Sequence, residues 1–172
     1  MVKKIALIIA HKDYQPIEYG VPKKMLEDAG YQVITVSNKA GTATASDGST
    51  TKVDILLDKF DPLTCDGIVF IGGQGALDYL DNDLSYQVIQ KAVMAEKLIA
   101  GICSASRILA KAGALAAKNA TGWDGDKALK EIFDKHAVIY DDETEVVTDG
   151  RIVTAQGPTN AREFAREIMA VV

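Results

Sequence analysis

The stretch "KLIAGICSASRILAKAGAL", residues 97–115, joins an apolar strand directly to a helix. Leu98–Ile102 contains only apolar residues and glycine, which is typical of a short strand buried on both faces. From Ser104 onward the apolar side chains follow helical spacing, and Gly113 is a stop signal. Since no residues are left for a turn, the chain must bend sharply at Cys103.

Cys103 itself is the first candidate for chemistry. A thiol at a helix start meets unpaired N–H groups and a partial positive charge, and both favour the thiolate. We therefore predict that Cys103 is a reactive thiol with a lowered pKa. The alternative is that cysteine is simply a small residue that packs well in a crowded turn. Position alone leaves both interpretations open.

Composition limits the class of protein. The 172 residues, of which 48% are hydrophobic and 25% charged, are typical of one globular domain over residues 1–172. The net charge of −5 and the lack of a basic stripe argue against a nucleic-acid partner. The apolar run in "MVKKIALIIAHKD" is too short for a membrane span or a secretion signal, so we interpret it as the first strand.

The cysteine content indicates a reducing compartment. The chain has only two cysteines, with no C-x-x-C pair, so a zinc site or a disulfide scaffold is not expected. We therefore expect a cytoplasmic protein that needs no metal or other cofactor. Cys65, which precedes Asp66, is predicted to be an inert packing thiol on the opposite side of the fold.

Strand-like and helix-like segments alternate along almost the whole chain. Strands are expected at 5–10, 31–37, 67–71, 98–102 and near 120, and helices at 16–29, 85–96, 104–112, 126–135 and 160–171. Asp47-Gly48 and Asp149-Gly150 indicate hairpins, the first in an excursion off the main sheet. This order predicts an α/β three-layer sandwich, with a mainly parallel, flavodoxin-like sheet between helices and short antiparallel hairpins.

In such sheets the functional groups collect at the carboxyl ends of the strands. His11, Gly72 and Cys103 all lie at predicted strand ends, and Glu18 falls in the first turn of the first helix. A protonated Glu18 could donate a hydrogen bond to a Cys103 thiolate, and the two groups would then titrate as a coupled pair. The alternative is that Glu18 only complements the helix dipole.

Three further features lie at the same edge. The glycines of "FIGGQG" (residues 70–75) lack the spacing of a dinucleotide or phosphate loop. Their N–H groups could bind a developing oxyanion, or the turn could simply need positive φ. His11 is either a base or a half-buried residue at a strand end. Trp123 either packs in the core or lines a pocket.

Taken together, the chain resembles the ThiJ/PfpI superfamily, also called DJ-one/PfpI, whose fold is similar to class I glutamine amidotransferases. The resemblance covers nearly the whole chain and rests on the order of four motifs: "PIEYGVPKKMLEDAG" (16–30), the Gly-Gly turn (72–73), "GICSASRILAKAG" (101–113) and "DGRIVTAQGPTNAREFAREI" (149–168). It implies that Cys103 is the nucleophile and Glu18 the carboxyl partner that tunes it. It also implies an oxyanion hole formed by the Gly73 and Ser104 amides, and a homodimer.

The chain departs from the family pattern at its histidines. Peptidase-like members carry a histidine directly after the cysteine, where this chain has Ser104. Members that resemble the human deglycase place a histidine in the loop where this chain has Trp123. Glutamine amidotransferases need a late His-x-Glu, and no histidine follows His136. No family-type Cys–His dyad can therefore be assembled, and His11 is the one substitute.

Three functions follow from this combination. The first is a cysteine-dependent enzyme acting on small reactive carbonyls, with glyoxalase- or deglycase-like chemistry and Glu18 as acid/base. The second is a non-enzymatic, redox-sensing stress protein whose Cys103 is oxidised to sulfenic or sulfinic acid. The third is an intracellular peptidase or amidase, which the missing histidine disfavours because an amine leaving group needs a proton. We favour the first, with a small molecule as substrate.

Overall fold

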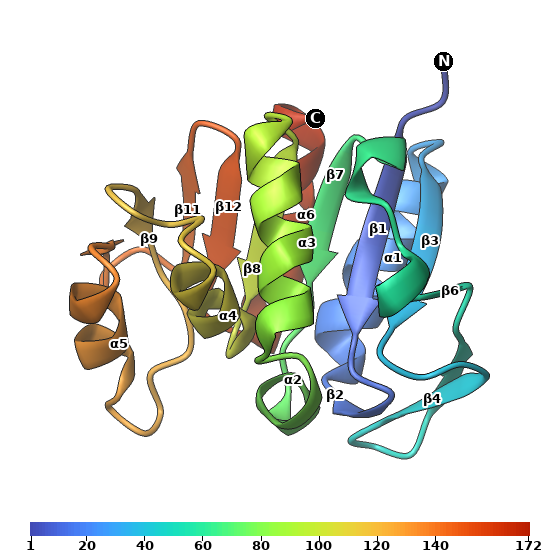
Figure 1. Cartoon of the computed structure of the whole chain (residues 1–172), viewed down its shortest axis with the longest axis horizontal. Helices are drawn as coiled ribbons and strands as arrows, with labels where there is room; N and C mark the ends of the chain where they lie inside the picture. Colours follow the sequence, from blue (N-terminus) through green and yellow to red (C-terminus); the bar gives the residue numbers. More distant parts are fainter.

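The computed structural model describes residues 1–172, and its main feature is a seven-stranded sheet (Figure 1). Its strands are β1 (Lys4–Ile9), β3 (Gln32–Ser37), β6 (Ile55–Leu56), β7 (Gly67–Phe70), β8 (Leu98–Ile102), β11 (Val146–Asp149) and β12 (Ile152–Ala155). Their order across the sheet is β11-β12-β8-β7-β1-β3-β6. Every neighbouring pair is parallel except β11 and β12, which form the predicted hairpin.

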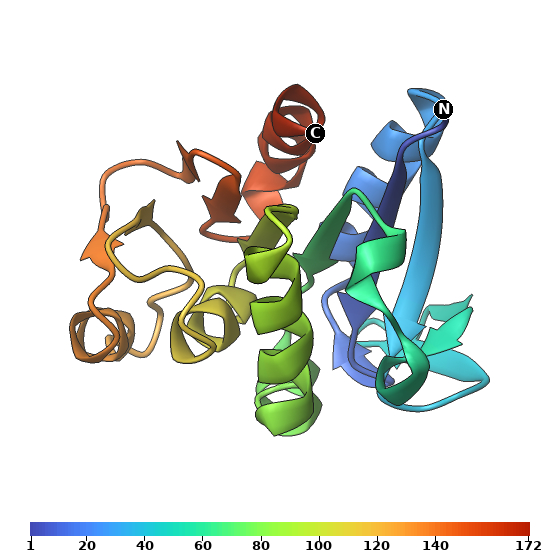
Figure 2. The ribbon, with the colours of Figure 1, turned by 45° about the horizontal axis from the view of Figure 1, so that its top comes forward.

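Helices cover both faces of this sheet. One face carries α1 (Pro16–Asp28) and α6 (Ala161–Val171), and the other carries α3 (Asp83–Met94), α4 (Ala105–Lys111) and α5 (Leu129–Lys135). Figure 2 shows α3 and α6 on opposite sides of the strands. The predicted α/β sandwich with a mainly parallel sheet is therefore confirmed.

The burial of β1 explains why its sequence is continuously apolar. Side chains alternate across a strand, so Ile5, Leu7 and Ile9 pack toward α1 and α6, whereas Ala6 and Ile8 pack toward α3 and α4. All five are completely buried. A strand with helices on both faces leaves no position for a polar side chain.

The excursion predicted around Asp47-Gly48 is a second, small sheet. It contains β2 (Lys12–Tyr14), β4 (Thr42–Ala45) and β5 (Thr50–Lys52), and β4 and β5 form the hairpin. Gly48 in the connecting turn has φ 85°, a conformation that glycine adopts easily. A third pair, β9 (Asn119–Ala120) and β10 (Ile139–Tyr140), is parallel and lies outside the main sheet.

Two helices differ from the sequence prediction. The helix expected from residue 126 begins at Leu129, because the side chains of Asp124 and Asp126 accept hydrogen bonds from the N–H groups of Leu129 and Ala128 and hold a loop there. The short helix α2 (Gln74–Tyr79) was not predicted, since it follows the glycine-rich turn without a polar cap. None of the helices has the length and apolar character that crossing a membrane requires.

Candidate active site at Cys103

The bend at Cys103 is a left-handed turn, with φ 61°. Few residues other than glycine adopt this conformation, and it concentrates at functional sites. The turn is held at both ends, because the Cys103 N–H donates to the Ala155 carbonyl (2.8 Å) and the Cys103 carbonyl accepts from the Trp123 N–H (3.2 Å). Helix α4 begins only two residues later, so the thiol stands at the top of a strand-to-helix turn.

Glu18 reaches the same point from the start of α1. The Gln15 side chain caps this helix, because its oxygen accepts hydrogen bonds from the N–H groups of Ile17 (2.6 Å) and Glu18 (2.9 Å). Pro16 occupies the first helical position, which proline favours. The Gln15 N–H also donates to the Gly72 carbonyl (3.0 Å), which ties the helix start to the end of β7. The Glu18 side chain is consequently directed inward and is completely buried.

Gly72 lies between the carboxyl group and the thiol. Its N–H donates to Glu18 Oε2 (2.9 Å), whereas Oε1 is buried without a hydrogen-bond partner. A Cβ atom at Gly72 would lie 2.6 Å from Glu18 Oε2 and 2.8 Å from the Cys103 Cβ. Only glycine therefore leaves room for Glu18 and Cys103 to meet.

The backbone N–H groups of Gly73 and Ser104 lower the pKa of the Cys103 thiol and so favour its ionised form, although burial outweighs them. Gly73 has φ 106°, and a Cβ there would lie 2.6 Å from the Asp13 carbonyl oxygen, so the close approach requires glycine. The Ser104 hydroxyl donates to the Gly73 carbonyl (3.0 Å) and holds the two segments together. These are the two amides that the family resemblance assigns to an oxyanion hole.

Glu18 and Cys103 form a coupled acid pair. Burial raises the pKa of Glu18 to about 7, although hydrogen bonds from Cys103 and Gly72 oppose this. Burial, and next the charge of Glu18, raise the pKa of Cys103 to about 12. The helix start alone therefore does not give the lowered thiol pKa that the sequence suggested. The first proton therefore leaves the pair near pH 7 and the second only near pH 12, so a Cys103 thiolate at neutral pH requires that Glu18 take up the thiol proton.

The thiol opens into a small pocket of about 210 Å³. Its lining residues are Gly73, Gln74, Leu77, Cys103, Ser104 and Trp123. A volume of this size suits a small molecule better than a folded protein segment. No group of three or more histidine, cysteine, aspartate or glutamate side chains lies close enough together to hold a metal ion.

Comparison with known proteins identifies the family. The sequence matches the model of the DJ-1/PfpI family over residues 3–171. The chain belongs to the DJ-1/PfpI family. It is 31% identical to the uncharacterised protein MJ0967 of Methanocaldococcus jannaschii over 98% of this chain and 82% of the relative. It is 28% identical to the Pyrococcus horikoshii protein named deglycase PH1704, over 96% of this chain and 98% of the relative.

A solved structure of a DJ-1/PfpI relative shows the same architecture. The ThiJ/PfpI domain protein of Brachyspira murdochii has a TM-score of 0.92 and 30% sequence identity, and the match covers 99% of this chain and 96% of that one. The family resemblance found in the sequence motifs is thus confirmed over the whole fold.

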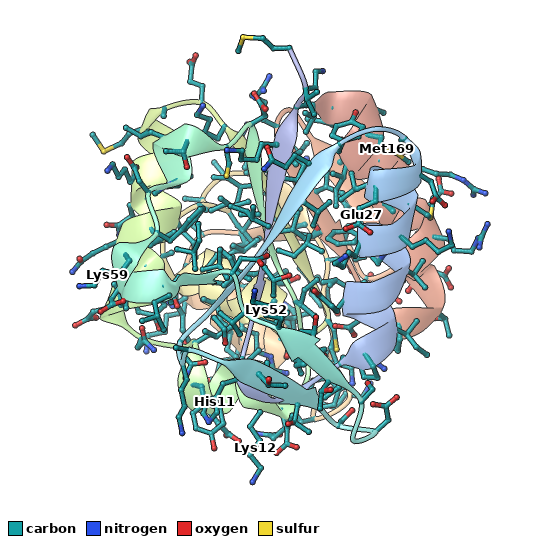
Figure 3. All side chains as sticks on the ribbon, turned by 90° about the vertical axis from the view of Figure 1, so that its right-hand side faces the viewer. His11, Lys12, Glu27, Lys52, Lys59 and Met169 are labelled. Atoms are coloured by element: carbon teal, nitrogen blue, oxygen red, sulfur yellow. The ribbon has the colours of Figure 1, made fainter.

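His11 lies apart from the Cys103 pocket. Its Nδ1 bonds with the Asn38 side-chain amide (2.9 Å), and its ring stands edge-on to Tyr79 with centroids 4.5 Å apart. Figure 3 shows it beside Lys12, by the small sheet. His11 is absent from the lining of the Cys103 pocket, so the structure does not bring these two residues together.

Trp123, by contrast, lies beside Cys103. It lines the pocket next to Cys103 and keeps 38% of its surface exposed, so it is a pocket wall and not a core residue. Gln74 and Leu77 line the same pocket and were not predicted, because both belong to the unpredicted helix α2. Cys65 is buried away from the pocket, and burial raises its pKa, as a packing thiol requires.

Proposed function

We propose that this DJ-1/PfpI protein is a cysteine-dependent enzyme that acts on small reactive carbonyls, with glyoxalase- or deglycase-like chemistry. The observation that carries the proposal is the pairing of Cys103, which lines a pocket without a histidine, with Glu18, which is buried behind it and has a pKa of about 7. An acid/base with a pKa near the working pH is the most effective kind. The relative named a deglycase supports the same class of chemistry.

The geometry suggests how the reaction begins. The Cys103 thiolate attacks the aldehyde carbon, a C–S bond forms, and the electron pair of the C=O bond moves to oxygen. The Gly73 and Ser104 N–H groups, which favour the ionised form of Cys103, are the donors that we assign to this oxyanion. Glu18 then gives its proton to the oxygen, which yields a neutral hemithioacetal and a carboxylate.

The same carboxylate can serve the second step. A hemithioacetal of a 2-oxoaldehyde carries an acidic C–H bond next to a carbonyl group. Glu18 takes that C–H proton while the electron pair of the carbonyl group moves to its oxygen, and the hydroxyl proton passes to that oxygen. Glu18 then returns its proton to the former carbonyl carbon, which gives a 2-hydroxy thioester of Cys103. Water hydrolyses this thioester, which releases a 2-hydroxy acid and restores the thiol. Since Glu18 is completely buried, its proton is shielded from solvent between the two steps.

A second candidate function is redox sensing. Cys103 is partly exposed, whereas Cys65 is buried elsewhere in the fold, so peroxide would oxidise Cys103 to a sulfenic or sulfinic acid and no internal disulfide would form. Either function needs a free thiol, and we assign the protein to a reducing compartment such as the cytoplasm.

The proposal is tested with a substrate panel of methylglyoxal, glyoxal, glutamine and casein. We expect the native protein and the control Cys65→Ser to consume the two dicarbonyls, and Cys103→Ala to consume neither. Hydrolysis of casein or glutamine would instead indicate a peptidase or an amidase. If the native protein turns over no substrate but peroxide adds two oxygens to Cys103, the redox function replaces the enzymatic one.

A further inference from the structure

Arg107 is a buried cation one helical turn after Cys103. Its side chain is only 6% exposed, and arginine is almost never this buried unless it is paired. Its partner is Asp126, in the loop before α5, and two parallel hydrogen bonds join them: Nη1 to Oδ2 (2.9 Å) and Nη2 to Oδ1 (2.6 Å). Asp126 Oδ1 also accepts from the Ala128 N–H (3.1 Å), so the pair fixes the loop.

The pair confines the Trp123 ring. The guanidinium carbon of Arg107 lies 5.2 Å from the ring centroid, within the range of a cation–π contact. The ring also packs against Gly125, where a Cβ atom would come within 2.4 Å of it. Glycine at this position therefore leaves the space that the ring occupies, and the ring is held between the two residues.

The backbone of Trp123 is held by the segment that carries the nucleophile. Its N–H donates to the Cys103 carbonyl (3.2 Å), and its own carbonyl accepts from Arg107 Nη2 (3.3 Å). The placement of Trp123 is therefore tied to the turn at Cys103 through two hydrogen bonds. Trp123 lines both the 210 Å³ cysteine pocket and a polar cleft of about 540 Å³, so it forms the wall between them.

We propose that Arg107 and Asp126 are positioning residues that hold Trp123 as the wall of the Cys103 pocket and thereby set the size of the substrate. The Asp126 side chain is 45% exposed, and such a partly exposed ion pair contributes little stability on its own, which argues against a purely structural role. The choice of methylglyoxal as a probe rests on the proposed function, whereas the position of Trp123 does not. The test therefore has one readout that needs no turnover.

The first readout is fluorescence, because Trp123 is the only tryptophan of the chain. Arg107→Lys keeps the positive charge but loses the planar guanidinium group that makes two hydrogen bonds to Asp126. Asp126→Asn removes the negative charge of the carboxylate that accepts them. We expect both variants to shift the emission to longer wavelength and to raise the acrylamide quenching constant about twofold, since the ring becomes mobile. The control is Lys130→Gln, which removes an exposed ion pair with Asp134 and should change neither value.

The second readout is kinetic. We expect Arg107→Lys and Asp126→Asn to raise KM for methylglyoxal about tenfold, the scale of a desolvated cation–π contact, while kcat stays within about threefold. Folded variants with native quenching and native KM would overturn the proposal, even if their melting temperature were lower. If neither variant folds, the KM of Trp123→Ala is measured instead, because this variant keeps the ion pair between Arg107 and Asp126. An unchanged KM in Trp123→Ala overturns the proposal, and a raised one supports it.

Absence of turnover in the native protein would refute the proposed function and leave the fluorescence test in place. In that case the rate of iodoacetamide labelling of Cys103 replaces KM. We then expect Arg107→Lys to change this rate at least threefold, and an unchanged rate together with native quenching would contradict the positioning role.

Discussion

Glu18 is the residue on which the chemistry depends, because it is a carboxylic acid held where water cannot solvate its charge. The Gly72 N–H gives its Oε2 one hydrogen bond, and its Oε1 has no partner. Burial outweighs the opposing effects of Cys103 and Gly72 on the pKa and keeps the acid protonated up to about pH 7. A glutamic acid of ordinary pKa would be ionised at neutral pH and would oppose the Cys103 thiolate instead of donating a proton to it.

This raised pKa predicts a pH dependence of stability. In the unfolded chain Glu18 ionises near its ordinary value of 4.5, whereas in the folded protein it ionises near 7. The contribution of Glu18 is therefore fully present below pH 4.5 and is lost as the pH rises to about 7, with a total of about 3 kcal/mol. Urea unfolding of the native protein and of Glu18→Gln at pH 5 and pH 8 measures it.

We expect the free energy of unfolding of the native protein to fall, relative to Glu18→Gln, between these two pH values. Because Gln has no proton to lose, the variant lacks this dependence. Parallel stability curves for the two proteins would show that Glu18 is not shifted and would remove the basis for its role as acid/base.

At the scale of the elements, the sequence patterns located most of the fold because each pattern has a local physical cause. The strand Leu98–Ile102 was predicted with its observed bounds, since an uninterrupted apolar run fits only a strand buried on both faces. Both Asp-Gly pairs mark hairpins in the structure. Helix α2 was missed because its six residues form by packing against neighbouring elements and not from a capped, periodic sequence.

The candidate site was predictable only as far as it depends on strand ends. Cys103, Glu18 and the Gly73 turn could be placed at one edge, because the carboxyl ends of parallel strands lie side by side. His11 occupies the same edge but is held by Asn38 and Tyr79, and a sequence gives no signal for such contacts. Arg107 was missed for the same reason. Its only signal in the sequence was an arginine among small and apolar residues at the helix start.

At the scale of the whole molecule, we propose that two copies of the chain associate. The family resemblance motivates this, and the structure adds an exposed apolar residue, Ile17 (50% exposed), at the start of α1 beside Glu18. We expect sedimentation at micromolar concentration to give twice the 18.4 kDa of one chain, and Ile17→Glu to weaken the association. A native monomer would contradict the proposal.

The central claim is that Cys103 and Glu18 act as one catalytic pair, and the rate of methylglyoxal consumption by Glu18→Gln tests it most directly. Gln keeps the size of the side chain and can donate a hydrogen bond, but it cannot give up and take back a proton. We expect Cys103→Ser to abolish turnover, Glu18→Gln to lower kcat on the order of 10²-fold or more, and His11→Ala to stay within about twofold of native. If His11→Ala removes the activity while Glu18→Gln retains it, Glu18 is not the acid/base and the account is contradicted.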